Sequence, residues 1–296
     1  MVIQTISLVI QDPPDMNLQD FLKADMLVPK KLLHEMRMSK KVTVNDDHPL
    51  WTKPLQSGDR ITLPIFPERV EPQATAMPVD VLAEDEHLLI VNKKAGVDTH
   101  PSSETDHLSL SNGVAYYFQQ TNIQAKVRHT HRLDKDTSGC ILFAKHAMSG
   151  AILDKLLAER KIKRTYLALV EGIMKTKQGT IEKSIGKDRH HAQRRRISPS
   201  GQRAVTHFKV IKEFSSENLT LVELHLDTGR THQIRVHLSS IGHPLFGDTL
   251  YGAKNKYHRH SLHAWKLAVP HPFNDSTITA EAPLPKDFGP AKLSLT

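Results

Sequence analysis

The chain has 296 residues, of which 39% are hydrophobic and 24% charged, and its formal net charge is +8. This length and composition indicate a globular protein with a sizeable core and room for two domains. No run of about 18 apolar residues is present, so we expect no membrane span, and the single cysteine, Cys140, excludes an internal disulfide and favours a cytoplasmic location.

The first 75 residues predict a small α+β unit. We expect strands over residues 2–10, 41–45 and 60–65 and helices over residues 18–26 and 30–38. The apolar start has no basic flank and no cleavage site, which favours a strand over a signal peptide. Residues 67–78, PERVEPQATAMP, are proline-rich and typical of a linker. The predicted domains are therefore residues 1–75 and 76–296.

The second predicted domain has strands and helices in mixed order. We expect strands over residues 79–83, 88–92, 141–144, 164–170, 205–214 and 219–226, and helices over residues 108–119 and 147–159. Strands dominate and do not alternate with helices one by one, so we predict an α+β fold with a mixed, largely antiparallel sheet. No G-x-G-x-x-G or Walker motif occurs, and nothing indicates a nucleotide cofactor.

The positive charge is concentrated in one segment. Residues 187–203 read KDRHHAQRRRISPSGQR, with six Lys or Arg and one Asp. A clustered excess of this kind suggests a polyanionic partner, although a basic run alone is equally typical of a solvated loop.

The densest group of polar side chains is HRLDKDTSGC, residues 131–140. Asp134, Asp136 and Ser138 have the opening spacing of a calcium loop, but the twelfth position holds Lys145 where such a loop needs a bidentate Glu. A calcium site is therefore not expected. DKDTSG by itself has the residue types of an ordinary turn, and a surface turn is the simplest interpretation of this segment alone.

A second segment, residues 225–248, predicts a helix with a core face. We expect Thr231 to cap this helix, and Ile234, Leu238 and Ile241 to face the core, because they recur at i, i+4 and i+7. Gly242, followed by His-Pro, is expected to end it. Arg235 lies off the core face, where it is either a surface arginine or available to a partner.

Together, HRLDKDTSG and GRTHQIRVHLSSIGHPLFGD resemble the signature segments of the RluA-like pseudouridine synthases. Further matches follow in the expected order, namely LLIVNKKAGVDTHP, KRTYLALVEG, AVTHFKVI and HSLHAWKLAVPHP. The resemblance covers roughly residues 79–285. It implies an RNA pseudouridine synthase, an isomerase that acts on uridine in rRNA or tRNA.

The resemblance implies that Asp134 is the catalytic carboxylate. The reaction detaches uracil from C1′ of the ribose, turns it and rejoins it through C5. An ionised carboxylate can serve either as nucleophile or as base in an elimination route, and neither route needs a metal or an organic cofactor. The resemblance also implies that Arg235 supplies the opposite charge, so we predict a pair with Asp134 within about 6 Å.

The other implied site residues contact the RNA. The resemblance implies that Tyr166 lies against the target base and helps to move the C5 proton. Arg132 fills the gap that the flipped uridine leaves, which is sensible because extrusion costs a few kcal/mol. His131 belongs to the same substrate-facing loop, which it helps to shape. RNA contacts from the basic segment are expected at Arg194, Arg195 and Arg196.

Residues 30–63 resemble an S4-type RNA-binding domain in their order of helix, VTVN strand and GDRI strand. Ser39-Lys40 stands where the pattern has a glycine, and Val28-Pro29 stands where it has Ser-Arg. We therefore expect a divergent S4-like domain.

Two other functions fit the sequence less well. A non-catalytic RNA-binding or ribosome-assembly factor would retain the fold, but a binder has no need of a buried carboxylate with Tyr166 and Arg235 beside it. A metal-dependent phosphoesterase would use some of the 19 histidines, yet HRHSLH provides no H-x-x-x-H spacing. We expect no metal, and a monomer as the default.

Overall fold

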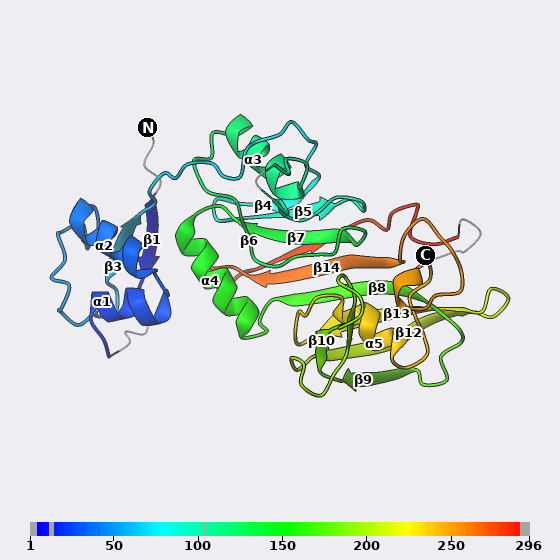
Figure 1. Ribbon diagram of the computed structural model, residues 1–296. Coiled ribbons are helices and arrows are strands. Elements are labelled where there is room, and N and C mark those ends of the chain that lie inside the picture. The colour runs from blue at the N-terminus through cyan, green and yellow to red at the C-terminus, as the bar shows by residue number, and fades with distance from the viewer. Residues whose placement is uncertain (1–4, 12–14, 104, 291–296) are drawn as a thin grey trace.

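The computed structural model describes residues 5–11, 15–103 and 105–290. Its N-terminal part, drawn in blue in Figure 1, is a three-stranded antiparallel sheet in the order β1-β3-β2, with helices packed against it. The elements are β1 Thr5–Val9, α1 Leu18–Asp20, a π-helical turn Phe21–Asp25, α2 Lys30–Ser39, β2 Thr43–Val44 and β3 Arg60–Pro64. All five predicted elements are present, and residues 2–4 of the first lie outside the described residues.

The rest of the chain is built on one ten-stranded sheet. Its main path is β4-β5-β7-β14-β8-β13-β12-β9, with β6 paired to β7 and β15 paired to β14. The strands are β4 Val81–Glu84, β5 Leu88–Lys93, β6 Arg128–His129, β7 Ser138–Ala144, β8 Lys163–Glu171, β9 Gln178–Glu182, β12 Val205–Phe214, β13 Leu219–Leu226, β14 Leu262–Pro270 and β15 Thr277–Glu281. Only β7 and β14 pair in parallel among the described strands, which confirms the mixed, largely antiparallel sheet.

Three helices flank this sheet (Figure 1). They are α3 Leu110–Gln120, α4 Ala147–Ala158 and α5 Gln233–Ser239. The basic segment forms a separate hairpin of β10 Ile185–Lys187 and β11 Arg195–Ile197. The strands β6, β9, β14 and β15 were not predicted. No helix of the described residues has the length and apolar character that crossing a membrane requires.

The helix α4 also contacts the N-terminal elements. Met148 and Ile152 of α4 belong to the same hydrophobic cluster as Leu22, Met36 and Leu63. The N-terminal sheet therefore packs on the larger part of the chain through apolar side chains.

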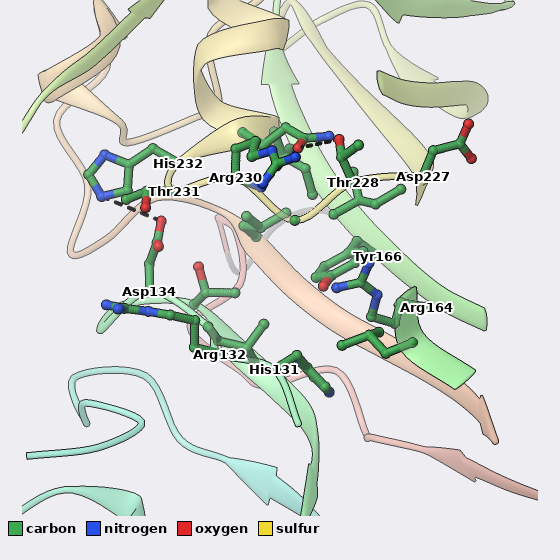
Figure 2. A pocket seen from close by; sticks show the side chains of 18 of the residues that line it. His131, Arg132, Asp134, Arg164, Tyr166, Asp227, Thr228, Arg230, Thr231 and His232 are labelled. Carbon is green, nitrogen blue, oxygen red and sulfur yellow. Dashed lines mark hydrogen bonds and ion pairs between the residues drawn. The ribbon is translucent and has the colours of Figure 1, made fainter. Parts of the chain in front are cut away.

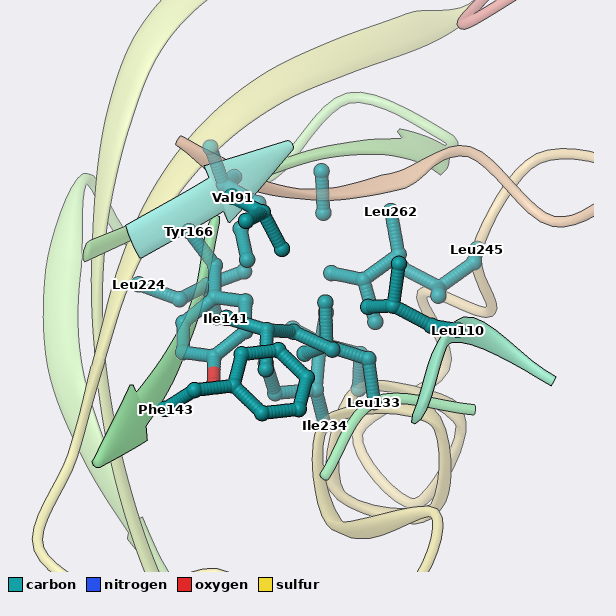
Figure 3. Close-up of a cluster of buried hydrophobic side chains, with 14 of the residues drawn as sticks. Val91, Leu110, Leu133, Ile141, Phe143, Tyr166, Leu224, Ile234, Leu245 and Leu262 are labelled. Atoms are coloured by element: carbon teal, nitrogen blue, oxygen red, sulfur yellow. The ribbon is translucent and has the colours of Figure 1, made fainter. Parts of the chain in front are cut away.

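The main core lies between the large sheet and the helices α3 and α5. Figure 3 shows its side chains converging from β5, β7, β8, β13 and both helices. Leu133 and Ile234 are 6% and 4% exposed and belong to this cluster. Each is followed in the chain by a predicted site residue, Asp134 and Arg235. The burial of these two apolar anchors brings the two distant motifs together.

Gly139 allows β7 to approach β14 directly after the Asp134 loop. Its φ is +113°, and a Cβ atom placed on it would lie 2.1 Å from the carbonyl oxygen of Ala264. Both facts require glycine, because other residues rarely adopt this φ and the neighbouring atom is backbone.

Gly139→Ala is therefore expected to destabilise the protein by more than about 3 kcal/mol, since it adds a backbone clash to a strained φ. Urea unfolding measures this effect. The matched control is Gly96→Ala, which has a φ of +82° and no atom within 4 Å of the added Cβ, and which should cost only about 1–2 kcal/mol. Equal costs for the two variants would show that the contact with β14 does not restrict residue 139.

Candidate active site

The predicted pair of Asp134 and Arg235 is present. Arg235 Nη1 donates to Asp134 Oδ2 at 3.2 Å. Arg235 also donates from Nε and Nη2 to the two carboxylate oxygens of Asp248, at 2.7 and 2.9 Å. Asp248 thus holds the guanidinium in a two-bond fork, and the third contact is directed at Asp134.

Burial distinguishes the three groups. The side chains of Arg235 and Asp248 are 9% and 2% exposed, whereas that of Asp134 is 22% exposed. Burial lowers the pKa of Arg235, but the hydrogen bonds and charges of Asp248 and Asp134 outweigh it, and the pKa lies above its usual value. Arg235 therefore stays charged, and Asp134 is the member that faces solvent. The surface-arginine interpretation was wrong, because two carboxylates compensate the charge inside the protein.

The start of α5 differs from the prediction. Thr231 does not cap the helix; His232 is the residue before it, in a left-handed conformation with φ 58°, and its side chain does not cap it either. Instead the imidazole turns toward the site, with Nε2 3.8 Å from Asp134 Oδ2 (Figure 2). Gln233, the first residue of the helix, instead binds the loop before it. Its side-chain oxygen accepts hydrogen bonds from the Arg230 N–H and the Thr228 hydroxyl.

Tyr251 connects this histidine to the basic hairpin. The Tyr251 hydroxyl accepts from the backbone N–H of Arg195 at 2.9 Å and lies 2.8 Å from His232 Nδ1. Since the hydroxyl has one hydrogen, it can donate to Nδ1, which leaves the Nε2–H of a neutral imidazole facing Asp134. The ring of Tyr251 also lies 4.9 Å below the Arg235 guanidinium carbon.

A buried lysine binds the backbone of the loop that carries Asp134. Lys93 is fully buried, and its ammonium donates to the carbonyls of Lys94, Val97 and Lys135 at 3.0, 2.6 and 2.8 Å. Burial lowers the pKa of Lys93 to about 7, while nearby aspartates oppose that shift. Lys135 follows Asp134 in the chain, so Lys93 fixes the backbone on which the carboxylate is mounted.

Asp134, His232 and Arg235 line a cavity of about 660 Å³. Figure 2 shows Asp134 and His232 on one side of it and Tyr166 and Arg164 on the other. Tyr166 is 5% exposed, and burial raises the pKa of its hydroxyl, an effect that Arg164 opposes. The cavity therefore places a carboxylate opposite an aromatic ring, with room for a flipped base between them.

The remaining predicted residues divide between two places. His131 and Arg132 line this cavity, His131 buried and Arg132 exposed at its rim. Burial lowers the pKa of His131 to about 3, so it is neutral. A second hollow of about 710 Å³ lies along the hairpin and Tyr251, and it is lined by all three predicted arginines, Arg194, Arg195 and Arg196. Arg194 pairs with Asp188 at 2.6 Å.

No group of three or more metal-ligating side chains occurs among residues 5–11, 15–103 and 105–290. Two of the three histidines of HRHSLH, His260 and His263, are buried and used in the packing. His260 bonds to the Thr137 hydroxyl at 2.8 Å, and His263 bonds to the Ser138 hydroxyl at 2.9 Å.

The sequence also matches known proteins. Residues 87–240 match the family model described as RNA pseudouridylate synthase, and residues 6–61 match the RluD ribosomal pseudouridine synthase N-terminal domain. A Bacillus subtilis protein named uncharacterized RNA pseudouridine synthase YhcT is 47% identical over 273 residues, covering 90% of this chain and 89% of that protein. The chain belongs to the RluA-like RNA pseudouridine synthase family.

Other members of the pseudouridine synthase family agree in sequence and fold. The ribosomal large subunit pseudouridine synthase D of Vibrio vulnificus is 35% identical over 278 residues, covering 86% of this chain and 83% of that protein. The solved structure of human RNA pseudouridylate synthase domain containing 1 is 26% identical, with a TM-score of 0.60 over 74% of this chain and 89% of that one. Membership makes this pseudouridine synthase an isomerase that acts on RNA.

Sequence reasoning missed four residues of this synthase site, namely Lys93, Arg164, His232 and Tyr251, as well as the partner carboxylate Asp248. Asp248 ends the quoted segment GHPLFGD, but its pairing with Arg235 depends on a turn after α5 that spacing alone does not reveal. Lys93 ends the apolar strand LLIVNK. A lysine in that position is usually exposed, so its burial had no signal in the sequence.

Asp248→Asn is expected to slow pseudouridine formation at least about tenfold, because the weakened fork no longer directs Arg235 at Asp134. It should also lower the free energy of unfolding by about 3 kcal/mol, the cost of breaking a buried ion pair. Single-turnover assays on rRNA from cells lacking the protein, and urea unfolding, measure the two effects. The control is Glu68→Gln, which breaks the two-bond fork to Arg128 outside the cavity. Wild-type kinetics in Asp248→Asn would contradict this role.

Acid should destabilise the fold through its buried histidines. Burial lowers the pKa of His263 to about 4 and that of His146 to about 3, below the usual value of 6.5. The unfolded chain therefore binds more protons below pH 6.5, and stability is full above that pH and falls toward pH 4. His263→Gln keeps one acceptor and one donor for Ser138 and Ala282, and its urea midpoint should depend less on pH. An equal slope in both proteins would contradict the assignment.

Proposed function

We propose that this synthase converts specific uridines of rRNA or tRNA to pseudouridine, with Asp134 as the catalytic carboxylate. One observation carries the proposal: Asp134 is a partly exposed carboxylate in the cavity, and it is bonded to a buried arginine that a second carboxylate holds. A carboxylate compensated in this way stays ionised in a partly dry cavity. It is then available to attack C1′ or to remove a proton from the ribose.

The opposite wall fits the base. Tyr166 projects its ring into the cavity, so a uracil with its C1′ beside Asp134 extends toward Tyr166 (Figure 2). In this proposal Tyr166 stacks against the base and assists in moving the C5 proton. Arg132, exposed at the rim, fills the space that the extruded nucleotide leaves in the RNA. His131 stays neutral and shapes the loop beneath it.

The RNA on either side of the target is proposed to follow the basic hairpin. The hollow beside β11 reaches Tyr251, which is bonded to His232 in the active-site cavity. Arg195 and Arg196 can contact phosphates there, while Arg194 is partly compensated by Asp188. We also propose that residues 1–75 form a divergent S4-like domain, and that the protein works as a cytoplasmic monomer. The names of the relatives favour ribosomal RNA of the large subunit.

A pseudouridine map of rRNA and tRNA tests this function. We expect cells that lack the protein to lose one or more pseudouridines, and wild type to restore them. Asp134→Asn should restore none, because an amide can neither attack C1′ nor accept a proton at neutral pH.

The matched control is Asp136→Asn, two residues away in the same loop, which should restore every site. If Asp134→Asn restores the lost sites, another group is the catalytic carboxylate. If deletion changes no site while the protein binds rRNA, a non-catalytic RNA-binding factor is the better description.

A further inference from the structure

We propose that Arg164 stabilises the negative charge on the uracil after its bond to C1′ breaks, by donating to a carbonyl oxygen of the base. This inference rests on the proposed function and adds a group that contacts the reacting base. It follows from the missing charged partner of Arg164, from its position, from the charges around it, and from the chemistry of the detached base.

Arg164, which lies beside the neutral Tyr166 hydroxyl, lacks the carboxylate partners of Arg235 and the carbonyl partners of Lys93. Its Nε atom is buried and has no hydrogen-bond partner. Among the residues that the structure describes, no carboxylate lies within ion-pair distance of it. The acid on the same wall, Asp227, is engaged elsewhere, with Arg160 at 3.5 Å and His207 at 3.2 Å. A partly buried guanidinium with unused donors is costly unless something binds it.

The position of Arg164 matches the base and not the phosphates. It lies beside Tyr166 on the wall across from Asp134 (Figure 2). Its Nη1 would lie 3.3 Å from a Cβ placed on Gly229, so the loop after β13 closes on one edge of the guanidinium. Arg230 is exposed in the lining of the same cavity and is better placed for a phosphate, while the exposed Arg132 is proposed to fill the vacated stack.

The charges of the cavity are separated. Asp134, Arg235 and Asp248 together carry a net charge of about −1, and Arg164 provides an uncompensated positive charge on the other wall. A negative group that binds near Arg164 is therefore attracted to that wall and kept away from the Asp134 side, where the ribose would lie.

Detached uracil is such a group. The C1′–N1 bond breaks as Asp134 bonds to C1′ or removes the proton on C2′; the electron pair stays with the base, and the charge spreads over O2 and O4. The base anion must persist while it turns, until C5 bonds to C1′ as the Asp134 ester leaves or as the proton returns to C2′. C5 then loses its proton and N1 takes one up. A preorganised donor that meets developing charge contributes about 10²–10³ in rate.

The first test is kinetic and uses a synthetic RNA that contains the mapped uridine. Arg164→Gln should lower the single-turnover rate at saturating enzyme about 100-fold, with the Kd for the RNA changed less than about threefold. Arg164→Lys, which keeps the charge without the planar fork, should retain an intermediate rate. The control Arg128→Gln removes an equal charge that Glu68 already compensates outside the cavity, and should stay within about threefold of wild type.

The second test distinguishes contact with the base from a structural role. The same RNA is prepared with 2-thiouridine or 4-thiouridine at the target, because sulfur accepts hydrogen bonds weakly and spreads negative charge well. The deficit of Arg164→Gln relative to wild type should shrink at least about tenfold on one of the two RNAs. That RNA identifies the oxygen that Arg164 contacts.

Three results would overturn the inference. An equal deficit on uridine and both thiouridines indicates that Arg164 acts only on the fold. Weakened RNA binding with an unchanged saturated rate indicates a phosphate contact. Wild-type rates in Arg164→Gln exclude any role. If the wild-type protein itself forms no pseudouridine, the proposed function fails first, and this inference fails with it.

Discussion

Arg235, buried between two carboxylates, is the interaction on which the site depends. Its two hydrogen bonds to Asp248 fix the plane of the guanidinium, and its single hydrogen bond to Asp134 binds one oxygen of that carboxylate. With one carboxylate, the arginine and its partner would form a neutral, closed pair. With two, the more buried acid compensates the arginine, and the more exposed acid keeps lone pairs directed at the cavity. A carboxylate can therefore remain both ionised and accessible inside the protein.

Hydrophobic packing makes this contact possible. Leu133 and Ile234 are separated by 100 residues of sequence but share one core cluster, and each immediately precedes a charged member of the site. Two further residues fix the loop that carries Asp134. Gly139 allows β14 to approach, and Lys93 binds the carbonyl of Lys135. The burial of Leu133 and Ile234 and the backbone contacts of Gly139 and Lys93 thus set the positions of Asp134 and Arg235.

Much of this arrangement was predictable from the sequence, because it follows local patterns. The apolar periods located most strands and helices. The contact of Asp134 with Arg235 was predicted only through the resemblance of two long motifs to a known family. The strand β14 was not predicted, since its buried positions include His263, whose partners Ser138 and Ala282 are distant in sequence. The prediction that Thr231 caps α5 was wrong, because the Gln233 side chain accepts the hydrogen bond from the loop N–H of Arg230 instead. Asp248, Lys93 and Arg164 acquire their roles from tertiary neighbours, which spacing along the chain does not encode.

The most direct test of the account separates binding from chemistry in the purified protein. Wild type and Asp134→Asn are compared on one unmodified rRNA transcript, with the Kd and the single-turnover yield of pseudouridine measured for each. The account predicts that both proteins bind with Kd values within about threefold, and that only wild type forms pseudouridine. Pseudouridine formation by Asp134→Asn at the wild-type rate would contradict it, because the carboxylate that Arg235 holds would then not be the group that reacts.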